Sequence, residues 1–148
     1  MKYAISLQKN IKMDKIIGLG NALVDALAII EDDNILTEMQ LPKGSMTLID
    51  EDKFLKISEY FSRMKTHLAN GGSAGNAIRA MACLVRVRGF IGKVSNDFYG
   101  NFFRDSLLER GTEANLLLST TLPSGVALLS FLLMESALSA LIWGRLLH

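Results

Sequence analysis

A glycine-rich segment near the middle of the chain reads Asn70-Gly71-Gly72-Ser73-Ala74-Gly75-Asn76-Ala77-Ile78-Arg79-Ala80. Its first half is predicted to be a loop, and the apolar residues that follow predict a helix over Ala77–Leu84. Glycines let backbone amides approach a ligand closely, and the start of a helix adds N–H groups that have no intrahelical partner. The segment therefore has the features of a loop that holds a ligand against the backbone.

The loop differs from two common phosphate-binding patterns. It does not end in the Gly-Lys-Ser/Thr of a Walker loop, and it lacks the Gly-x-Gly-x-x-Gly of dinucleotide-binding domains. Ser73 and Asn76 instead supply neutral hydrogen-bonding groups, which suit hydroxyls. Each residue also has a simpler explanation, because a glycine pair before a helix is usually a turn and Asn76 is usually a cap.

A second group of polar residues follows a short buried strand predicted over Ile16–Gly20. Asn21 and Asp25 interrupt an apolar segment, Ala22–Ile30, which we interpret as strand, turn and strand. Their spacing of four after a strand end lets both border one pocket. An ionised Asp25 only accepts hydrogen bonds, so it can receive two hydroxyl protons from a sugar diol. The alternative is that its carboxylate satisfies the backbone of a loop.

Helices and strands alternate along the rest of the chain. We expect a short helix at Ile35–Met39, a strand at Met46–Ile49, an amphipathic helix over Asp52–Leu68, a strand at Phe90–Val94, a helix capped by Asn96 and Asp97 and closed by Gly111, and a strand at Leu116–Ser119. This alternation predicts an α/β architecture with a largely parallel sheet.

Bulk composition excludes several classes of protein. The chain has 148 residues, of which 49% are hydrophobic and 21% charged, so it can form a packed core. A net charge of +1 gives no electrostatic basis for binding nucleic acid or an anionic membrane surface. The single cysteine, Cys83, allows no intrachain disulfide and fits a reducing, cytoplasmic compartment.

Three motifs together resemble the ribokinase-type (PfkB) family of sugar and nucleoside kinases, especially its adenosine-kinase-like branch. Residues 18–25, Gly-Leu-Gly-Asn-Ala-Leu-Val-Asp, look like the opening strand and sugar-binding segment. Residues 71–80 look like the first family signature. Residues 92–100, Gly-Lys-Val-Ser-Asn-Asp-Phe-Tyr-Gly, resemble the Gly-x-x-Gly-x-Asp-x-x-Gly element that follows, with Ser95 where glycine is usual.

The resemblance implies a Rossmann-like parallel sheet with a small β lid over the sugar, the lid including segments around Ala26–Ile30 and Met46–Ile49. It implies that Gly71 shapes the loop and that sugar hydroxyls are contacted by Asn21, Asp25, Gly72, Ser73 and Asn76. It also implies phosphoryl transfer from ATP to a hydroxymethyl group of a sugar or nucleoside, with Mg²⁺.

The family's catalytic base and anion hole lie in an Asp-Thr-x-Gly-Ala-Gly-Asp stretch that has no match here, and most of its nucleotide site lies in the C-terminal half. We therefore expect a truncated, N-terminal part of a kinase, with no catalytic residue, no ATP site and no metal site of its own. Phosphoryl transfer depends on positioning and charge stabilisation, so we expect no turnover from this chain.

The chain divides into three parts on this interpretation. Residues 1–12 are an N-terminal extension before a natural start at Met13, residues 13–127 are the partial kinase domain, and residues 128–148 are an aberrant tail. A one-base shift near Ala127 allows a strand, a Pro-Asp-Gly turn and a strand, so we interpret the tail as a frameshift product. A similar shift over residues 85–88 allows a glycine-rich turn. In both places the alternative is that the residues are genuine.

Two other classes of protein stay open. Val126–Trp143 is apolar for nearly the length of a membrane span, although Glu135 lies near its middle, so a C-terminal anchor is one alternative. The other is a non-catalytic fragment that binds a sugar or nucleoside. An exposed sheet face of the lid can also support a homodimer.

Overall fold

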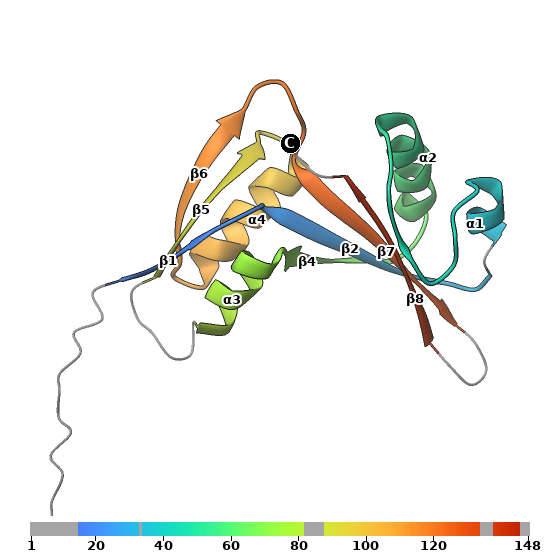
Figure 1. Cartoon of the computed structure of the whole chain (residues 1–148), viewed down its shortest axis with the longest axis horizontal. Coiled ribbons are helices and arrows are strands. Elements are labelled where there is room, and N and C mark those ends of the chain that lie inside the picture. Colours follow the sequence, from blue (N-terminus) through green and yellow to red (C-terminus); the bar gives the residue numbers. More distant parts are fainter. Residues whose placement is uncertain (1–14, 33, 82–87, 134–137, 146–148) are drawn as a thin grey trace, which may run out of the picture.

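The computed structural model describes residues 15–32, 34–81, 88–133 and 138–145. The predicted extension at 1–12, the proposed start at Met13, and residues 85–87 lie outside this range. Two sheets organise the described chain (Figure 1), one of three strands and one of five.

The three-stranded sheet is entirely parallel. Its order is β1 (Ile16–Leu19), β5 (Arg88–Ser95) and β6 (Glu113–Ser119). Helices α3 (Ser73–Met81) and α4 (Phe98–Glu109) pack on one of its faces. The core between them includes Ile78, Phe90 and Phe103, and the rings of the two phenylalanines lie 5.3 Å apart.

The other face of this parallel sheet carries exposed apolar side chains. Ile17 is 52% exposed, Leu19 74% and Leu117 67%. Parallel sheets in α/β proteins are normally covered on both faces, because their strands are apolar on both sides. The described chain thus covers only one side of this sheet.

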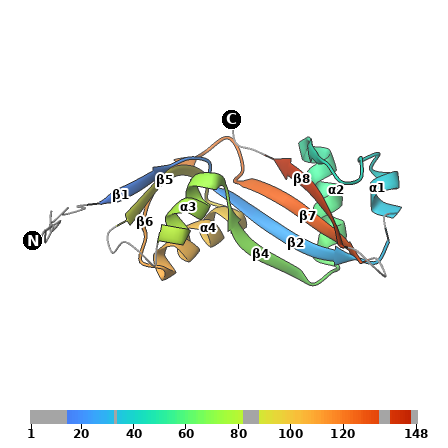
Figure 2. The same cartoon turned by 60° about the horizontal axis from the view of Figure 1, so that its bottom comes forward.

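The five-stranded sheet, which we call the lid sheet, is mixed. Its order is β3 (Met46–Leu48), β8 (Leu138–Arg145), β7 (Gly125–Leu133), β2 (Leu23–Ile30) and β4 (Thr66–Gly71). Helices α1 (Asn34–Glu38) and α2 (Glu51–Ser62) lie together at the end of the lid sheet far from α3 and α4 (Figure 2). A second core, including Ile30, Ile57 and Phe61, joins them to the sheet.

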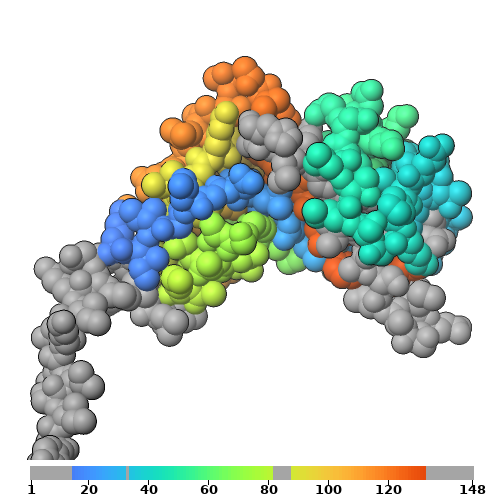
Figure 3. All heavy atoms as spheres, in the orientation of Figure 1, coloured from blue at the N-terminus to red at the C-terminus, as the bar shows by residue number. Residues whose placement is uncertain are grey.

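β2 connects the two halves of the molecule. In the space-filling view its atoms run from the blue and green lobe towards the lobe of α1 and α2 (Figure 3). Its even-numbered residues are buried: Ala22 before the strand and Val24 belong to the first core, while Ala26, Ala28 and Ile30 belong to the second. Its odd-numbered residues face the opposite, more open side of the lid sheet.

Three predicted boundaries are wrong. β2 is one continuous strand, because all eight of its residues pair with β7. The amphipathic helix ends at Ser62 rather than Leu68, because Thr66–Gly71 pairs with β2 as β4. Helix α3 begins at Ser73, so the second half of the predicted loop is helical.

Other predicted elements are confirmed. Asp97 caps α4, its side chain accepting a hydrogen bond from the Gly100 amide at 2.7 Å. Gly111 follows the end of that helix with a φ of +67°, the left-handed conformation that glycine adopts readily. The predicted strands at the start of the chain and at Met46–Ile49 correspond to β1 and β3.

The segments interpreted as frameshifted take ordered positions where they are described. β7 continues past Ala127 in register with β2, and β8 pairs with β7 in antiparallel fashion. Arg88 is buried, and its guanidinium donates to the Thr112 hydroxyl at 3.0 Å and to the Arg110 carbonyl. Within the described residues, none of the helices has the length and apolar character needed to cross a bilayer.

Candidate functional site

Three connections join the two sheets. Residues 20–22 lead from β1 into β2, Gly72 leads from β4 into α3, and residues 120–124 lead from β6 into β7. All six predicted site residues lie on or beside the first two connections. The fold therefore gathers two motifs that are separated by about fifty residues of sequence.

The carboxylate of Asp25 lies directly against the backbone of Gly71. A Cβ atom at Gly71 would come within 2.3 Å of Asp25 Oδ1 and 2.7 Å of Oδ2. No side chain other than hydrogen fits between the two residues. Because Gly71 has no side chain, the Asp25 carboxylate can lie against the last residue of β4.

Small residues also flank Asp25 across the lid sheet. Its neighbour on β4 is Ala69 and its neighbour on β7 is Ala127. Register partners in a sheet place their side chains on the same face. The carboxylate of Asp25 consequently has short side chains on both sides of it in the sheet.

Gly72 brings the β1–β2 connection to the start of α3. Its φ of +79° is a turn conformation that other residues rarely adopt, and a Cβ there would lie 2.7 Å from the carbonyl oxygen of Asn21. On the other side of the connection, a Cβ at Gly20 would lie 2.8 Å from that of Ala74. These close approaches place Asn21 beside the first turn of α3.

Ser73 and Asn76 belong to that first turn. Both residues are exposed, and the Asn76 amide donates to the Gly72 carbonyl at 2.9 Å. Asn76 thus lies one turn inside α3 and is not its N-cap. The side chains of Asn21, Ser73 and Asn76 are all exposed to solvent. Their roles in ligand binding stay predictions.

Burial raises the pKa of the Asp25 carboxyl, and the positive charge of Arg79 on α3 partly opposes this rise. No local pattern predicts a role for Arg79, because its charge acts on a residue of β2 about fifty residues earlier in the chain. Ala69 and Ala127 were missed for the same reason, since strand pairing makes them neighbours of Asp25.

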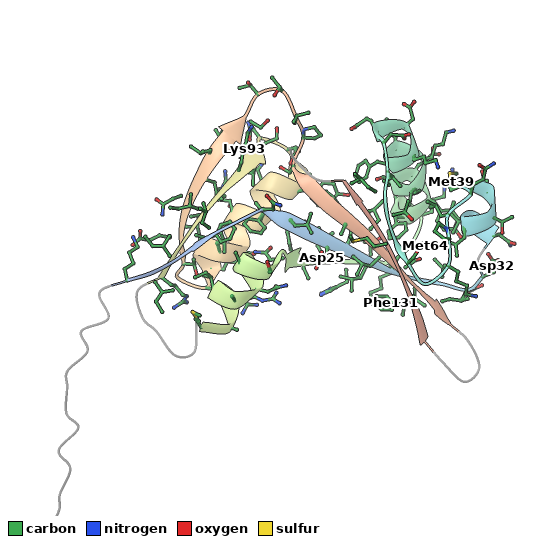
Figure 4. All side chains as sticks on the ribbon, in the orientation of Figure 1. Asp25, Asp32, Met39, Met64, Lys93 and Phe131 are labelled. Atoms are coloured by element: carbon green, nitrogen blue, oxygen red, sulfur yellow. The ribbon has the colours of Figure 1, made fainter. Side chains whose placement is uncertain are left out.

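Beyond Asp25, the open face of the lid sheet carries apolar side chains together with Lys65 and His67. A cavity of about 430 Å³ lies farther along β2, lined by Leu27, Ile29 and Phe131 with Lys65 and His67. A second hollow, of about 330 Å³, lies at the carboxyl ends of β1 and β5 and includes Asn21 and Lys93. Figure 4 shows Asp25 between Lys93, at the end of β5, and Phe131 in the lid. Asp25 does not line either cavity.

The part of the chain that the structure describes contains no group of three His, Cys, Asp or Glu side chains able to hold a metal ion.

Solved structures of kinases share this fold, although neither a protein-family model nor a curated protein matches the sequence. An adenosine kinase from Anopheles gambiae, in complex with P1,P4-di(adenosine-5) tetraphosphate, matches with a TM-score of 0.74 and 22% identity, over 88% of this chain and 38% of that chain. An adenosine kinase from Sinorhizobium meliloti matches with a TM-score of 0.66 and 28% identity, over 89% and 39%. A probable sugar kinase from Rhizobium etli matches with a TM-score of 0.62 and 25% identity, over 89% and 38%.

The comparisons confirm the predicted fold class. The chain has the α/β fold of these kinases, with a three-stranded parallel sheet and an attached mixed sheet of five strands. It spans less than two fifths of the length of the matched structures. The activity of those longer proteins is therefore only proposed for this chain.

Proposed function

We propose that this chain carries the acceptor-binding part of an ATP-dependent sugar or nucleoside kinase, and that its acceptor is a nucleoside. The proposal depends mainly on the contact between Asp25 and Gly71, which places a half-buried, acceptor-only carboxylate among small residues. A pair of neighbouring hydroxyls is the group that such a carboxylate recognises best, because it can donate one hydrogen bond to each oxygen.

The surroundings of Asp25 favour a nucleoside over a simple sugar. Beyond the carboxylate, the same face of the lid sheet presents Leu27, Ile29 and Phe131. A nucleoside has both a diol and a flat apolar base, and ligand sites commonly combine an apolar lining with a few polar groups. Two of the matched kinases are adenosine kinases, which agrees with this choice.

The polar residues of the two connections complete the proposed site. Asn21, Ser73 and Asn76 would hydrogen-bond the remaining hydroxyls, while Gly72 lets the backbone come close to them. Such binding positions a hydroxymethyl group for phosphoryl transfer, which requires ATP and Mg²⁺ held elsewhere. We expect the chain alone to bind the acceptor and not to phosphorylate it.

Isothermal titration calorimetry on the full 148-residue chain, without ATP, tests the proposal. We expect heat of binding with adenosine and little with ribose or fructose. Asp25→Asn should weaken adenosine binding by at least about tenfold, since hydrogen bonds to charged groups contribute about 1.5–3 kcal/mol. Asp105→Asn is the control, because Asp105 is exposed on α4 and pairs with Arg104. Absence of heat with all three ligands would contradict the proposal.

A non-catalytic binding protein is the alternative, and it predicts the same calorimetry. Transfer of labelled phosphate from Mg-ATP to adenosine separates the two. No transfer by the chain alone, together with transfer after the C-terminal part of a matched adenosine kinase is added, would favour the kinase interpretation. Binding of adenosine with no transfer in either mixture would favour the alternative.

A further inference from the structure

The side-chain carboxylate of Asp97 accepts hydrogen bonds from two different parts of the fold. Oδ1 accepts from the Gly100 amide at 2.7 Å, which caps α4. Oδ2 accepts from the Ser124 amide at 2.8 Å, which lies immediately before β7 of the lid sheet. The first bond is an ordinary N-cap, whereas the second joins α4 to the lid and needs a separate explanation.

Ser124 is also hydrogen-bonded to the three-stranded sheet. Its side-chain oxygen accepts a hydrogen bond from the Ser95 amide, at the end of β5, at 2.9 Å. Ser124 is 1% exposed. A Cβ at Gly100 would lie 2.6 Å from this oxygen and 2.1 Å from the Ser95 carbonyl, so the packing is close on every side.

These contacts fix the third connection between the sheets, residues 120–124. The other two connections carry the candidate site: Asn21 lies on one, and Gly72 is the other. Asp25 belongs to the lid sheet, whereas Ser73 and Asn76 belong to α3, beside the three-stranded sheet. The relative position of the two sheets therefore sets the distances between the two halves of the site.

We propose that Asp97 is a positioning residue, which holds the start of β7 against the ends of β5 and α4 and so fixes the lid sheet relative to the three-stranded sheet. A carboxylate is required because both of its oxygens accept hydrogen bonds from backbone amides. An asparagine at this position still caps α4, but its amide group would turn a donor towards the Ser124 amide, which is also a donor.

Asp50 provides a matched control within the same chain. It caps α2 in the same way, its side chain accepting from the Lys53 amide at 2.8 Å. It is exposed, and the hydrogen bond that its side chain accepts from Lys53 stays within its own helix. Since asparagine and aspartate are comparable N-caps, Asp50→Asn should change little, and any larger effect of Asp97→Asn reports the bond to Ser124.

The test measures the distance between the two lobes in the full chain. Spin labels are attached at Lys56→Cys on α2 and Glu109→Cys on α4, both exposed positions, with Cys83→Ser to remove the native thiol. Double electron–electron resonance then gives the distribution of distances between them. We expect Asp97→Asn to broaden this distribution and shift its centre, and Asp50→Asn to leave it unchanged.

Circular dichroism identifies variants that fail to fold. If Asp97→Asn does not fold, Ser124→Ala is measured instead, because it removes the bond from the Ser95 amide and should broaden the distribution to a smaller extent. An unchanged distribution in the folded variant overturns the inference.

The inference extends the proposed function but is tested apart from it. If the site binds adenosine as proposed, Asp97→Asn should weaken that binding about tenfold, the factor for one lost hydrogen bond. If the parent chain binds no adenosine, the proposed function fails while the lid distances still decide the role of Asp97. Unchanged distances with normal adenosine binding refute only the positioning role.

Discussion

Gly71 and Gly75 lie four residues apart in one motif, yet their surroundings differ. A Cβ at Gly71 would overlap the Asp25 carboxylate, with Oδ1 at 2.3 Å. A Cβ at Gly75, inside α3, would have its nearest neighbour, Phe103 Cζ, at an ordinary 3.6 Å. Of these two glycines, therefore, only Gly71 cannot be replaced without a clash with a residue of the candidate site.

We expect Gly71→Ala to move the Asp25 carboxylate and to weaken adenosine binding at least about tenfold. Gly75→Ala should leave binding unchanged and raise the free energy of unfolding by about 0.5–1 kcal/mol, since alanine is the better helix former. Calorimetry and urea denaturation of both variants check these outcomes. Equal losses of binding would show that the site depends on helix packing rather than on the contact with Asp25.

The raised pKa of Asp25 gives adenosine binding a pH dependence. Only the ionised carboxylate accepts two hydroxyl protons, so binding is lost as pH falls through the folded-state pKa, which burial places above the ordinary 3.8. We expect affinity to decline at a higher pH than an ordinary aspartate would give. Affinities measured by calorimetry between about pH 4 and pH 7 check this, and a constant affinity down to about pH 4 would contradict it.

The same shift has the opposite consequence for folding. A raised folded-state pKa favours the protonated form, so the stability that Asp25 contributes is present below its unfolded pKa and is lost as pH rises through the folded value. Asp25→Asn should therefore not lower the free energy of unfolding at neutral pH. A loss of both stability and binding would indicate a structural role for the carboxylate.

At the scale of single elements, β2 shows what local patterns predict well and what they do not. Its alternation of buried and open residues follows the two-residue period of a strand. Polar Asp25 in the middle of the segment suggested a turn, but the residue lies on the open face, where a carboxylate is tolerated. Pairing with β4 on one side and β7 on the other keeps the strand continuous.

The boundary between α2 and β4 could not be found from the local sequence. Phe54, Ile57 and Phe61 have helical spacing and are buried by α2, and Leu68 continues that spacing although it lies in a strand. What ends the helical pattern is pairing with β2, about forty residues earlier in the chain. Strand formation depends on such partners more than on the residues themselves.

A pair of substitutions in β2 tests the continuity of the strand. Ala28 is 2% exposed and faces the core under α2, whereas its neighbour Ile29 is 63% exposed on the open face. Ala28→Asp should lower the free energy of unfolding by at least about 3 kcal/mol, because it buries an unpaired charge. Ile29→Asp should change it by no more than about 0.5 kcal/mol. Denaturant unfolding of both variants measures the difference, and similar losses would contradict the alternation.

At the scale of the whole molecule, the sequence predicted the motifs of the candidate site but not what surrounds them. Asn21, Asp25 and residues 71–76 could be singled out because glycine and polar residues interrupt apolar segments. The alanines beside Asp25, the charge of Arg79 and the bonds of Asp97 depend on pairing and packing between distant segments. Such contacts leave no local pattern.

The uncovered faces of the two sheets predict self-association. Ile17, Leu19 and Leu117 make the outer face of the three-stranded sheet apolar, and a parallel sheet normally has helices on that side. We expect sedimentation velocity to show association that increases with protein concentration. Leu19→Gln combined with Leu117→Gln should shift the chain towards the monomer without lowering the free energy of unfolding, because both side chains are already exposed.

The open face of the lid sheet is the other candidate surface for self-association, and it is the one that the expected homodimer through the lid would use. Ile29 and Leu48 are exposed there, at 63% and 62%. Ile29→Gln combined with Leu48→Gln is therefore the matched control, with the same number of apolar side chains replaced by the same residue. Because no described segment covers the outer face of the three-stranded sheet, we expect its variant to have the larger effect. A monomer produced only by the lid variant would place the association at the lid.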